Sequence, residues 1–556
     1  MNIVDILLEK NLVTAEQVAE AMDLRTTSGL RLDRALVKLG YIREERLLAE
    51  TSERLGIPLV DLSTAKIDVE TLRNLPPKLM YRKHLLPISR ANGTLTVATS
   101  DPFDLYAFDE LKLLTGLEIQ PVLALEDEID KHIKMHYGVG GDTIDEMMST
   151  DDLEVIGDQD GAKDEDLEMA QEASVIKLVN ELFLEAINER ATDIHIEPYE
   201  HDLHIRYRID GVLQLATLPP QIRRFQAAII SRIKIMSNMN IAEKRLPQDG
   251  RIKLVAGGKQ LDVRVSVIPM LYGEGIVMRL LNKSTTMYTL PQLGMGEDTF
   301  EIFGHLIDRP HGILLVTGPT GSGKTTTLYA ALSAIISPEI KVLTVEEPVE
   351  YHLEGVNQIG VNSKIGMTFA RALRAILRHD PDVVMIGEIR DLETAEAAIQ
   401  AALTGHLVLS TLHTNDACSA ATRLLDMGIE PFLVTSTMEA AMAQRLVRTI
   451  CSECKEPYEP DGETLPADLG YQKGEIFYRG RGCRKCHNTG YYGRCGLFEL
   501  MVTSDAIREC IMARRPASDI VNIARREGLR LLREDGWIKV RQGVTTPEEV
   551  MRCTKM

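Results

Sequence analysis

The 556-residue sequence has few aromatic residues, a single tryptophan and no excess of basic charge. Aromatic residues make up 5% of the chain, and 82 acidic against 63 basic side chains give a formal net charge of -19 at pH 7. Nucleic-acid surfaces need clustered Lys and Arg, and channels for single strands add stacking aromatics. Both shortages argue against a broad nucleic-acid-binding surface.

Long apolar runs and a secretion signal are also missing. The longest uncharged run, residues 397–415, is interrupted by Gly405 and two histidines, which is typical of a helix end followed by a buried strand. The first nine residues carry Asp5 and no basic region of the kind that opens a signal peptide. We therefore expect a cytoplasmic protein without a membrane span.

Eight cysteines are too few for a disulfide framework in a chain of this length. Four of them form two C-x-x-C pairs, Cys451 with Cys454 and Cys483 with Cys486, separated by 28 residues. Each pair can present two thiolates to one tetrahedral ion, so the spacing predicts a zinc site at about 450–490. Four thiolates leave no open coordination position, which favours a structural role; His487 is a less economical ligand.

The length predicts three or four domains at about 150 residues each. In residues 1–62, apolar positions at helical spacing recur 29 residues later, which predicts two copies of a helical repeat that pack against each other. These positions are Leu7, Leu8, Leu12, Val13 and Val18, then Leu36, Val37, Tyr41, Ile42 and Leu47. Residues 63–138 combine a strand-like run with helical segments, which predicts a small α+β domain.

An acidic segment follows at 139–172. Between Asp142 and Glu172 there are thirteen acidic residues and one lysine, so this stretch holds twelve of the nineteen excess negative charges. It is too poor in apolar residues to bury a core, which predicts a linker that its own charge keeps extended.

Two folded segments are predicted after the linker. Alternating polar and apolar residues at 193–197, 204–210 and 261–267 predict an antiparallel sheet within 173–290. From about residue 300, short fully apolar runs alternate with helical segments. Such runs, at 313–316, 342–345, 383–386 and 407–409, are typical of buried parallel strands and predict an α/β domain over 291–556.

A phosphate-binding loop lies between the first of these strands and a helix. Residues 318–325 fit G-x-x-x-x-G-K-[ST], whose glycines let backbone amides converge on phosphate oxygens. Lys324 supplies charge at the β and γ phosphates, and Thr325 can ligate Mg²⁺. The predicted nucleotide contacts are Gly318, Pro319, Thr320, Gly321, Ser322, Gly323, Lys324, Thr325 and Thr326. The base-reading motif N-K-x-D of GTPases is absent, so we expect ATP.

Acidic residues end two neighbouring predicted strands. Glu388 closes a Walker B-like strand, and a second acidic group lies at 346–350. One such carboxylate can hold Mg²⁺ while another polarises the attacking water; the alternative for either is a solvated loop carboxylate. His406 and His413 flank the strand at 407–411. A histidine there can contact the γ-phosphate, or it can be a capping or buried residue.

Together these motifs resemble the secretion ATPases of type II secretion and type IV pilus assembly. The shared segments are the phosphate loop, 344–350, 387–391, 405–408 with His413, 193–198 and the four cysteines. The resemblance covers nearly the whole chain. It implies cytoplasmic homo-hexamers, peripherally associated with an inner-membrane platform. Each subunit would contain a PAS-like domain, a linker and a RecA-like P-loop ATPase domain.

The resemblance also implies residue roles. Lys324 and Thr325 match the Walker A residues, Glu388 the Walker B glutamate, with Mg²⁺ held by Thr325 and Glu388. The family has Asp where this chain has Glu347, and we expect the extra methylene to make Glu346 the catalytic carboxylate. His406 and His413 match the histidine box. Arg206, Arg208, Arg264 and Arg279 correspond to arginines that approach nucleotide; a solvated sheet face is the alternative.

The N-terminal repeat resembles a cyclic-di-GMP-binding domain whose motif opens with Arg-Leu-Gly. The second copy here has Arg31, Leu32 and Asp33. Because Asp33 adds negative charge where a phosphate would approach, we expect instead a docking module for an inner-membrane platform protein and a membrane-anchored docking protein. The cysteine segment resembles assembly and secretion members, since retraction members lack it.

The sequence therefore predicts a hexameric ATPase that powers assembly of a pilus or pseudopilus, with ATP, Mg²⁺ and Zn²⁺ as cofactors. The alternative is a nucleic-acid translocase or DNA-uptake ATPase with a zinc ribbon, against which the acidic balance and the few aromatics argue. A scaffold without activity is disfavoured because no residue of the phosphate loop is missing.

Overall fold

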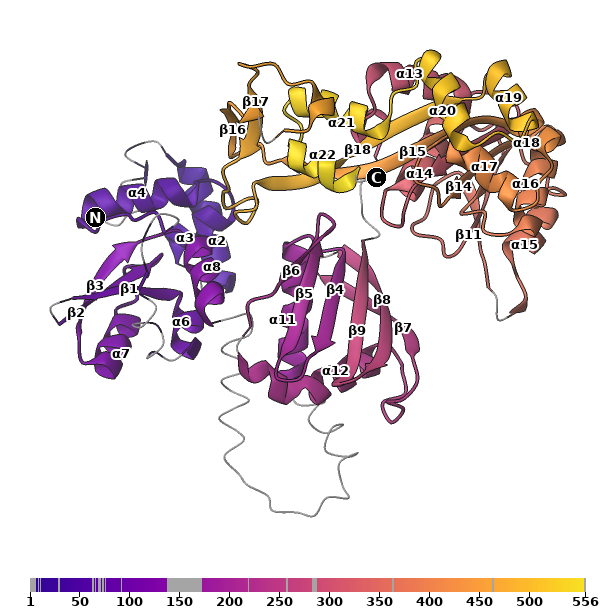
Figure 1. Ribbon diagram of the computed structural model, residues 1–556. Helices are drawn as coiled ribbons and strands as arrows, with labels where there is room; N and C mark the ends of the chain where they lie inside the picture. The colour runs from indigo at the N-terminus through magenta and orange to yellow at the C-terminus, as the bar shows by residue number, and fades with distance from the viewer. Residues whose placement is uncertain are drawn as a thin grey trace. The chain divides into compact units, whose positions relative to one another are not determined.

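A computed structural model describes residues 7–8, 10, 12–28, 31–62, 65, 67–68, 72, 75, 77–91, 93–137, 173–218, 220–256, 259–282, 288–362, 365–462 and 465–554 (Figure 1). The chain divides into two compact units, residues 1–257 with 261–280, and residues 258–260 with 281–556. The predicted acidic linker lies outside the described residues. Within the described ranges, no helix is both long and apolar enough to cross a membrane.

The N-terminal repeat forms a small helical core. Its helices are α2 (Ala15–Ser28), α3 (Leu32–Lys38) and α4 (Glu44–Leu55). All ten apolar positions of the two predicted copies lie in one hydrophobic cluster, with Leu7, Val13, Val18, Leu36, Ile42 and Leu47 buried. The repeat therefore packs its two stripes against each other, as the 29-residue recurrence predicts.

A three-stranded α+β layer follows. Strand β1 (Leu85–Ala91) pairs antiparallel with β2 (Thr94–Thr99), which pairs in parallel with β3 (Glu118–Leu123). Helices α6 (Pro77–Lys83), α7 (Leu105–Thr115) and α8 (Glu126–Tyr137) complete it. Arg34 of the repeat joins the two parts, because its guanidinium lies 2.8 Å from Glu44 and 3.6 Å from Glu126 of α8. The boundary near residue 62 stays a prediction.

The next segment is an antiparallel sheet covered by helices, as the alternating runs predict. Its strand order is β6-β5-β4-β9-β8-β7. The strands are β4 (Asp193–Pro198), β5 (Leu203–Ile209), β6 (Val212–Leu215), β7 (Gln248–Ala256), β8 (Lys259–Met270) and β9 (Gly273–Asn282). Helices α11 (Ala173–Asn188) and α12 (Gln226–Met236) share a core with the apolar strand face, which includes Ile194, Ile196 and Ile205. Polar residues of β4 and β5 are left on the other face.

The second unit is built on a seven-stranded sheet of order β12-β11-β13-β14-β10-β15-β18. The strands are β10 (Gly312–Thr317), β11 (Val342–Glu346), β12 (Val356–Gly360), β13 (Val383–Ile386), β14 (Leu407–Leu412), β15 (Met438–Ile450) and β18 (Tyr491–Val502). The first six are parallel, and β18 pairs antiparallel with β15. The predicted apolar runs therefore correspond to buried parallel strands.

Both faces of this sheet are buried, which explains why its strands are apolar throughout. Ile313 and Leu315 of β10 belong to one hydrophobic cluster, and Leu314 and Val316 to the other. The first cluster takes in α15 (Phe369–Ile376), α16 (Leu392–Leu403), α17 (Ser419–Asp426), α18 (Pro431–Thr437), α19 (Asp505–Met512) and α20 (Ala517–Arg526). The second takes in α13 (Glu297–Ile307) and α14 (Lys324–Ile335).

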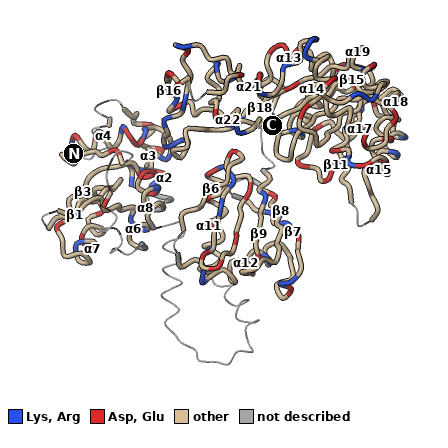
Figure 2. The backbone as a smooth tube through the Cα atoms, viewed as in Figure 1, with Lys and Arg blue, Asp and Glu red and all other residues tan. Residues whose placement is uncertain are grey.

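A smaller lobe follows β15. It contains the two-stranded sheet of β16 (Lys455–Tyr458) and β17 (Phe477–Gly480) with helices α21 (Leu532–Arg541) and α22 (Pro547–Cys553). Trp537 packs there with Phe477, Val540 and Val550. Acidic and basic positions are interspersed along the described chain (Figure 2).

Candidate nucleotide site and cysteine cluster

The phosphate loop has the strand–loop–helix context that the sequence predicts, since it joins buried β10 to α14. Gly318 and Gly323 adopt φ angles of +146° and +90°, which disfavour other residues. A Cβ at Gly318 would lie 2.6 Å from both the Gln444 carbonyl oxygen and Ser322 Oγ. The loop is thus packed tightly against β15, and only glycine fits at its first position.

Lys324 bends back over the loop. Its Nζ donates to the carbonyl oxygens of Gly318, at 2.8 Å, and Pro319, at 3.1 Å. Burial lowers the pKa of Lys324; the charge of Glu388 raises it and that of Arg445 lowers it further. Ser322 Oγ is buried and has no hydrogen-bond partner among the described residues. In the described ranges, the Lys324 ammonium contacts only neutral oxygens of the loop and the Ser322 hydroxyl is buried without a partner, which is typical of a loop that binds an anion.

The other loop residues are more open. Pro319, Thr320 and Gly321 are exposed, and Thr325 and Thr326 at the start of α14 are partly buried. The predicted contacts from Gly318 to Thr326 therefore form one continuous surface at the end of β10.

Glu388 and His413 come together at the same edge of the sheet. They follow β13 and β14, which pair in parallel with each other. Because β14 also pairs in parallel with β10, the carboxyl ends of all three strands lie at one side. His413 Nε2 lies 3.1 Å from Glu388 Oε2, and Arg390 Nη2 lies 2.5 Å from Glu388 Oε1. The Glu388 side chain is 13% exposed. We call the end of the sheet where β10, β11, β13 and β14 finish the carboxyl edge.

Glu346 is held inside the fold, and its role as the catalytic carboxylate stays a prediction. It is buried and accepts hydrogen bonds from Thr344 Oγ1 at 2.6 Å, Gln358 Nε2 at 3.0 Å and the Tyr329 hydroxyl. Both oxygens are thereby satisfied inside the protein. Burial, together with the bond to Glu346, raises the pKa of Tyr329.

Glu347 is the acid at this strand end that faces outward. Its side chain is 40% exposed, and Oε2 accepts from Arg390 Nη1 at 3.5 Å. Arg390 thus joins Glu347 to Glu388. The motif at 387–391 includes Arg390, but its spacing predicts no partner for this side chain.

His406 lies at the opposite end of β14 from His413, so the structure does not bring it to the carboxyl edge. A six-residue strand separates them by roughly 20 Å. His406 Nδ1 lies 2.8 Å from the Ala401 carbonyl oxygen and 3.1 Å from Thr404 Oγ1. It caps the end of α16, which was the structural alternative for this residue.

The predicted arginines lie on the six-stranded sheet of the first unit, and each of three is paired with an acid. Arg206 donates to Glu197 at 2.7 Å. Arg279 Nε lies 2.9 Å and Arg208 Nε 3.7 Å from Asp193. Arg264 lies on β8 of the same sheet. Their approach to nucleotide stays a prediction.

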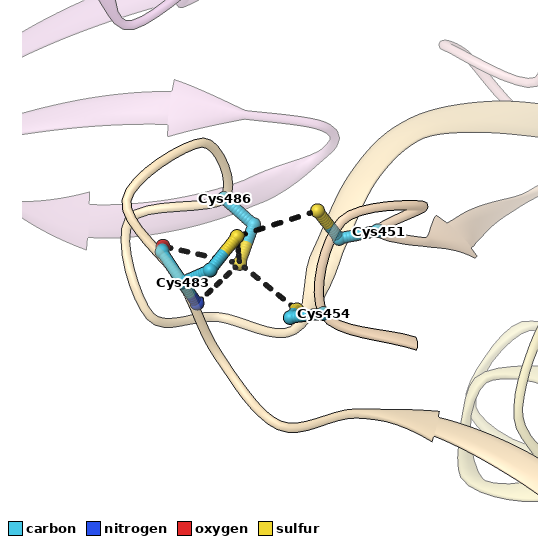
Figure 3. A group of neighbouring side chains, drawn as sticks. All are labelled: Cys451, Cys454, Cys483 and Cys486. Carbon is cyan, nitrogen blue, oxygen red and sulfur yellow. Dashed lines mark hydrogen bonds between the residues drawn. The ribbon is translucent and has the colours of Figure 1, made fainter. Parts of the chain in front are cut away.

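The four predicted cysteines converge (Figure 3). The Sγ atoms of Cys451 and Cys483 are 3.6 Å apart, and Cys486 Sγ lies 3.7 Å from those of both Cys454 and Cys483. All four Sγ atoms lie within 4.8 Å of one another. Burial raises the pKa of Cys486, but hydrogen bonds from the Cys483 and Gly490 backbone prevail and lower it to about 7. His487 is exposed and is not part of this cluster.

The fold and the loop define a P-loop ATPase, and comparison with known proteins gives its family. The family model "Type II/IV secretion system protein" matches residues 168–552, and the MshEN domain model matches residues 55–143. The chain belongs to the type II/IV secretion system protein family and is an ATP hydrolase. The resemblance seen in its motifs is thereby confirmed.

Relatives of nearly equal length support this assignment. The chain is 44% identical to the type IV pilus assembly ATPase PilB of Myxococcus xanthus, with 99% of this chain and 98% of the relative covered. It is 45% identical to the type II secretion system protein E of Xanthomonas campestris pv. campestris, with 100% and 98% covered. Among solved structures, the ATPase DotB of Yersinia pseudotuberculosis covers 68% of this chain and 93% of its own, with 21% identity and a TM-score of 0.51. That likeness shows the fold alone.

Proposed function

We propose that the protein is the hexameric motor of a type II secretion or type IV pilus system, which hydrolyses ATP at residues 318–325 to assemble a pseudopilus or pilus. One observation carries the proposal: the phosphate loop, Glu388 and His413 meet at one edge of the sheet. The names and near-complete coverage of the two relatives support the choice of system. A cytoplasmic protein bound peripherally to the inner membrane fits this role.

The residues at the carboxyl edge would have different roles in ATP hydrolysis. Lys324 exchanges the Gly318 and Pro319 carbonyl oxygens for β and γ phosphate oxygens, and Ser322 Oγ gains a partner. Thr325 and Glu388 are the residues that would hold Mg²⁺, which neutralises developing charge on the phosphates. Arg390 and His413 fix the Glu388 carboxylate, which faces the attacking water or the metal.

Turnover of Mg-ATP by purified variants tests this assignment. Glu388→Gln keeps the shape of the side chain and removes its charge, so we expect turnover to fall about 100-fold or more. Glu393→Gln, an exposed acid of α16, is the matched control and should stay near the wild-type rate. Turnover by Glu388→Gln within about twofold of wild type would contradict the site.

The arginines of the six-stranded sheet would serve a neighbouring nucleotide. In a hexamer, Arg206, Arg208 and Arg279 can exchange their acidic partners for phosphate oxygens of an adjacent subunit. Sedimentation of the purified protein with Mg-ATP should show a hexamer. A monomer at all concentrations would argue against contact of these arginines with the nucleotide of an adjacent subunit.

The cysteine cluster fits a structural zinc ion. A tetrahedron with Zn–S bonds of about 2.3 Å has edges of about 3.8 Å, close to the 3.6 and 3.7 Å separations found. The ion would tie β15 to the segment before β18. Elemental analysis should find one zinc per chain in wild type and none in Cys454→Ser; less than about half an equivalent in wild type would contradict it.

The N-terminal segments would dock the motor to a membrane-platform protein and a membrane-anchored docking protein. Arg31 is held by Asp33 at 2.8 Å and Asp101 at 3.4 Å, and its guanidinium lies 4.2 Å from the Phe103 ring centroid. This arginine is therefore engaged by acids of its own chain, which supports docking over cyclic-di-GMP binding. Sub-micromolar cyclic-di-GMP affinity in a titration would reverse that choice.

A further inference from the structure

Strand β15 places Arg445, a residue outside the sequence motifs, beside the phosphate loop. Its register with β10 pairs Ala443 with Thr317, the last residue before the loop. Gln444 and Arg445 therefore lie level with the start of the loop. A Cβ at Gly318 would approach Arg445 Nη1 to 3.1 Å, so the guanidinium lies directly against the first loop residue.

Within the described part of the chain, the Arg445 guanidinium donates hydrogen bonds only to neutral groups. Nη1 donates to the Gln444 carbonyl oxygen at 3.0 Å, and Nη2 donates to Asn415 O at 2.9 Å and Oδ1 at 3.3 Å. Among the described residues, no carboxylate lies within ion-pair distance of it. Asp416 and Glu499 act on it only at longer range. A half-buried cation without a counter-ion is costly unless a ligand supplies one.

Arg445 and Lys324 carry their charges at the same end of the loop. Lys324 Nζ lies on the carbonyl oxygens of Gly318 and Pro319, and Arg445 Nη1 lies beside Gly318. Burial lowers the pKa of both, and the charge of Arg445 contributes to the shift at Lys324. Two cations held this close repel each other until an anion of at least two charges comes between them.

We infer that Arg445 is a phosphate-contacting residue of the same subunit, which binds the terminal phosphate of the nucleoside triphosphate together with Lys324. The inference rests on the proposed ATP site. The Lys324 side of a phosphate loop receives the β and γ phosphates, which assigns Arg445 to the γ end. Asn415, two residues after His413, holds the guanidinium and so couples the loop that carries His413 to the nucleotide.

Two nucleotides that differ in the terminal phosphate test the inference. Affinities for Mg-AMP-PNP and Mg-ADP are measured by titration for wild type and Arg445→Gln, with Arg515→Gln as control. Arg515 is exposed and pairs with Asp519 of α20. Its substitution by Gln therefore removes the same charge at a position away from the loop. We expect Arg445→Gln to bind AMP-PNP at least about tenfold more weakly and ADP within about threefold of wild type. Thermal unfolding of each variant checks the fold.

A second variant keeps the test decisive if Arg445→Gln fails to fold. Arg445→Lys retains the charge and the aliphatic stem but loses the fork of donors, and should weaken AMP-PNP binding about threefold or more with ADP unchanged. Unchanged AMP-PNP affinity in these variants, or an equal loss of affinity for both nucleotides, overturns the role of Arg445 but leaves the proposed ATP site standing. Wild-type protein that binds neither nucleotide overturns the proposed function as well.

Discussion

The two large sheets of this protein carry their basic residues in opposite ways. At the carboxyl edge of the seven-stranded sheet, Lys324 and Arg445 donate to neutral oxygens and have no carboxylate within ion-pair distance among the described residues. On the six-stranded sheet, the arginines are paired: Arg206 with Glu197, and Arg208 and Arg279 with Asp193.

This difference separates two uses of charge. A cation neutralised by the protein itself lets a polar sheet face form without unpaired charge. A cation that contacts only neutral oxygens stays uncompensated until an anionic ligand binds, and binding then removes an electrostatic cost already present in the fold. Substitution of an acid should therefore have different consequences in different parts of the molecule, and four such substitutions measure the contrast.

The sharpest contrast lies within strand β15, because Arg448 is neutralised and Arg445 is not. Glu549 accepts from Arg448 at 2.5 Å and from Arg552 at 2.8 Å. Burial would raise the pKa of Glu549, but these arginines prevail and lower it from 4.5 to about 2. A lowered folded pKa gives stability that is present above pH 4.5 and is lost as the pH falls towards 2.

We expect Glu549→Gln to lower the free energy of unfolding by about 3 kcal/mol at pH 7 and to show little of the wild-type loss between pH 5 and pH 3. Denaturant unfolding followed by the fluorescence of Trp537, the single tryptophan, reports on this lobe because Trp537 packs with Val550. Glu393→Gln should behave like wild type. A Glu549 variant with the same pH dependence as wild type would show that the ion pair adds nothing.

Glu346 and Glu347 test whether a buried acid near the carboxyl edge serves the fold or the reaction. Glu346→Gln leaves one of its three donors without an acceptor, so we expect a loss of about 2 kcal/mol in unfolding free energy with turnover within about threefold of wild type. Glu347→Gln should show the reverse, about tenfold slower turnover and unchanged stability. Equal turnover losses in the two variants would favour a catalytic role for Glu346 as well.

The smallest effect is expected on the six-stranded sheet. Asp193→Asn removes the charge that faces Arg208 and Arg279, whose side chains are 35% and 52% exposed, so solvent already screens the pair. The loss should be about 1 kcal/mol. Faster hydrogen exchange of the backbone amides in β4 than in wild type reports this loss, with exposed Asp202→Asn as control. If Asp193→Asn loses no more stability than the control, the ion pairs of Asp193 with Arg208 and Arg279 do not stabilise the sheet.

Much of this architecture was predictable from periodicity. The repeat of 1–62 and the buried strands of the second unit follow from spacing alone, because burial on one face or on two leaves a direct trace in the residue pattern. The phosphate loop and the cysteine pairs were equally clear, since their chemistry fixes both residue type and interval.

Side-chain direction was not predictable. Glu346 and Glu347 are adjacent, and a strand end leaves open which of them turns inward until Tyr329 and Gln358 are placed. His406 and His413 flank the same strand, yet parallel pairing puts only His413 at the carboxyl edge. Arg445 belongs to no motif, because its proximity to the loop arises from the register of β15 with β10.

The unneutralised cations at the carboxyl edge form the proposed nucleotide site. Titration of wild type and Lys324→Ala with Mg-AMP-PNP tests it directly, with Lys473→Ala, an exposed lysine of the same unit, as control. We predict that Lys324→Ala binds at least about 100-fold more weakly than wild type while the control is unchanged. Equal affinity of Lys324→Ala and wild type would show that nucleotide does not bind at these cations.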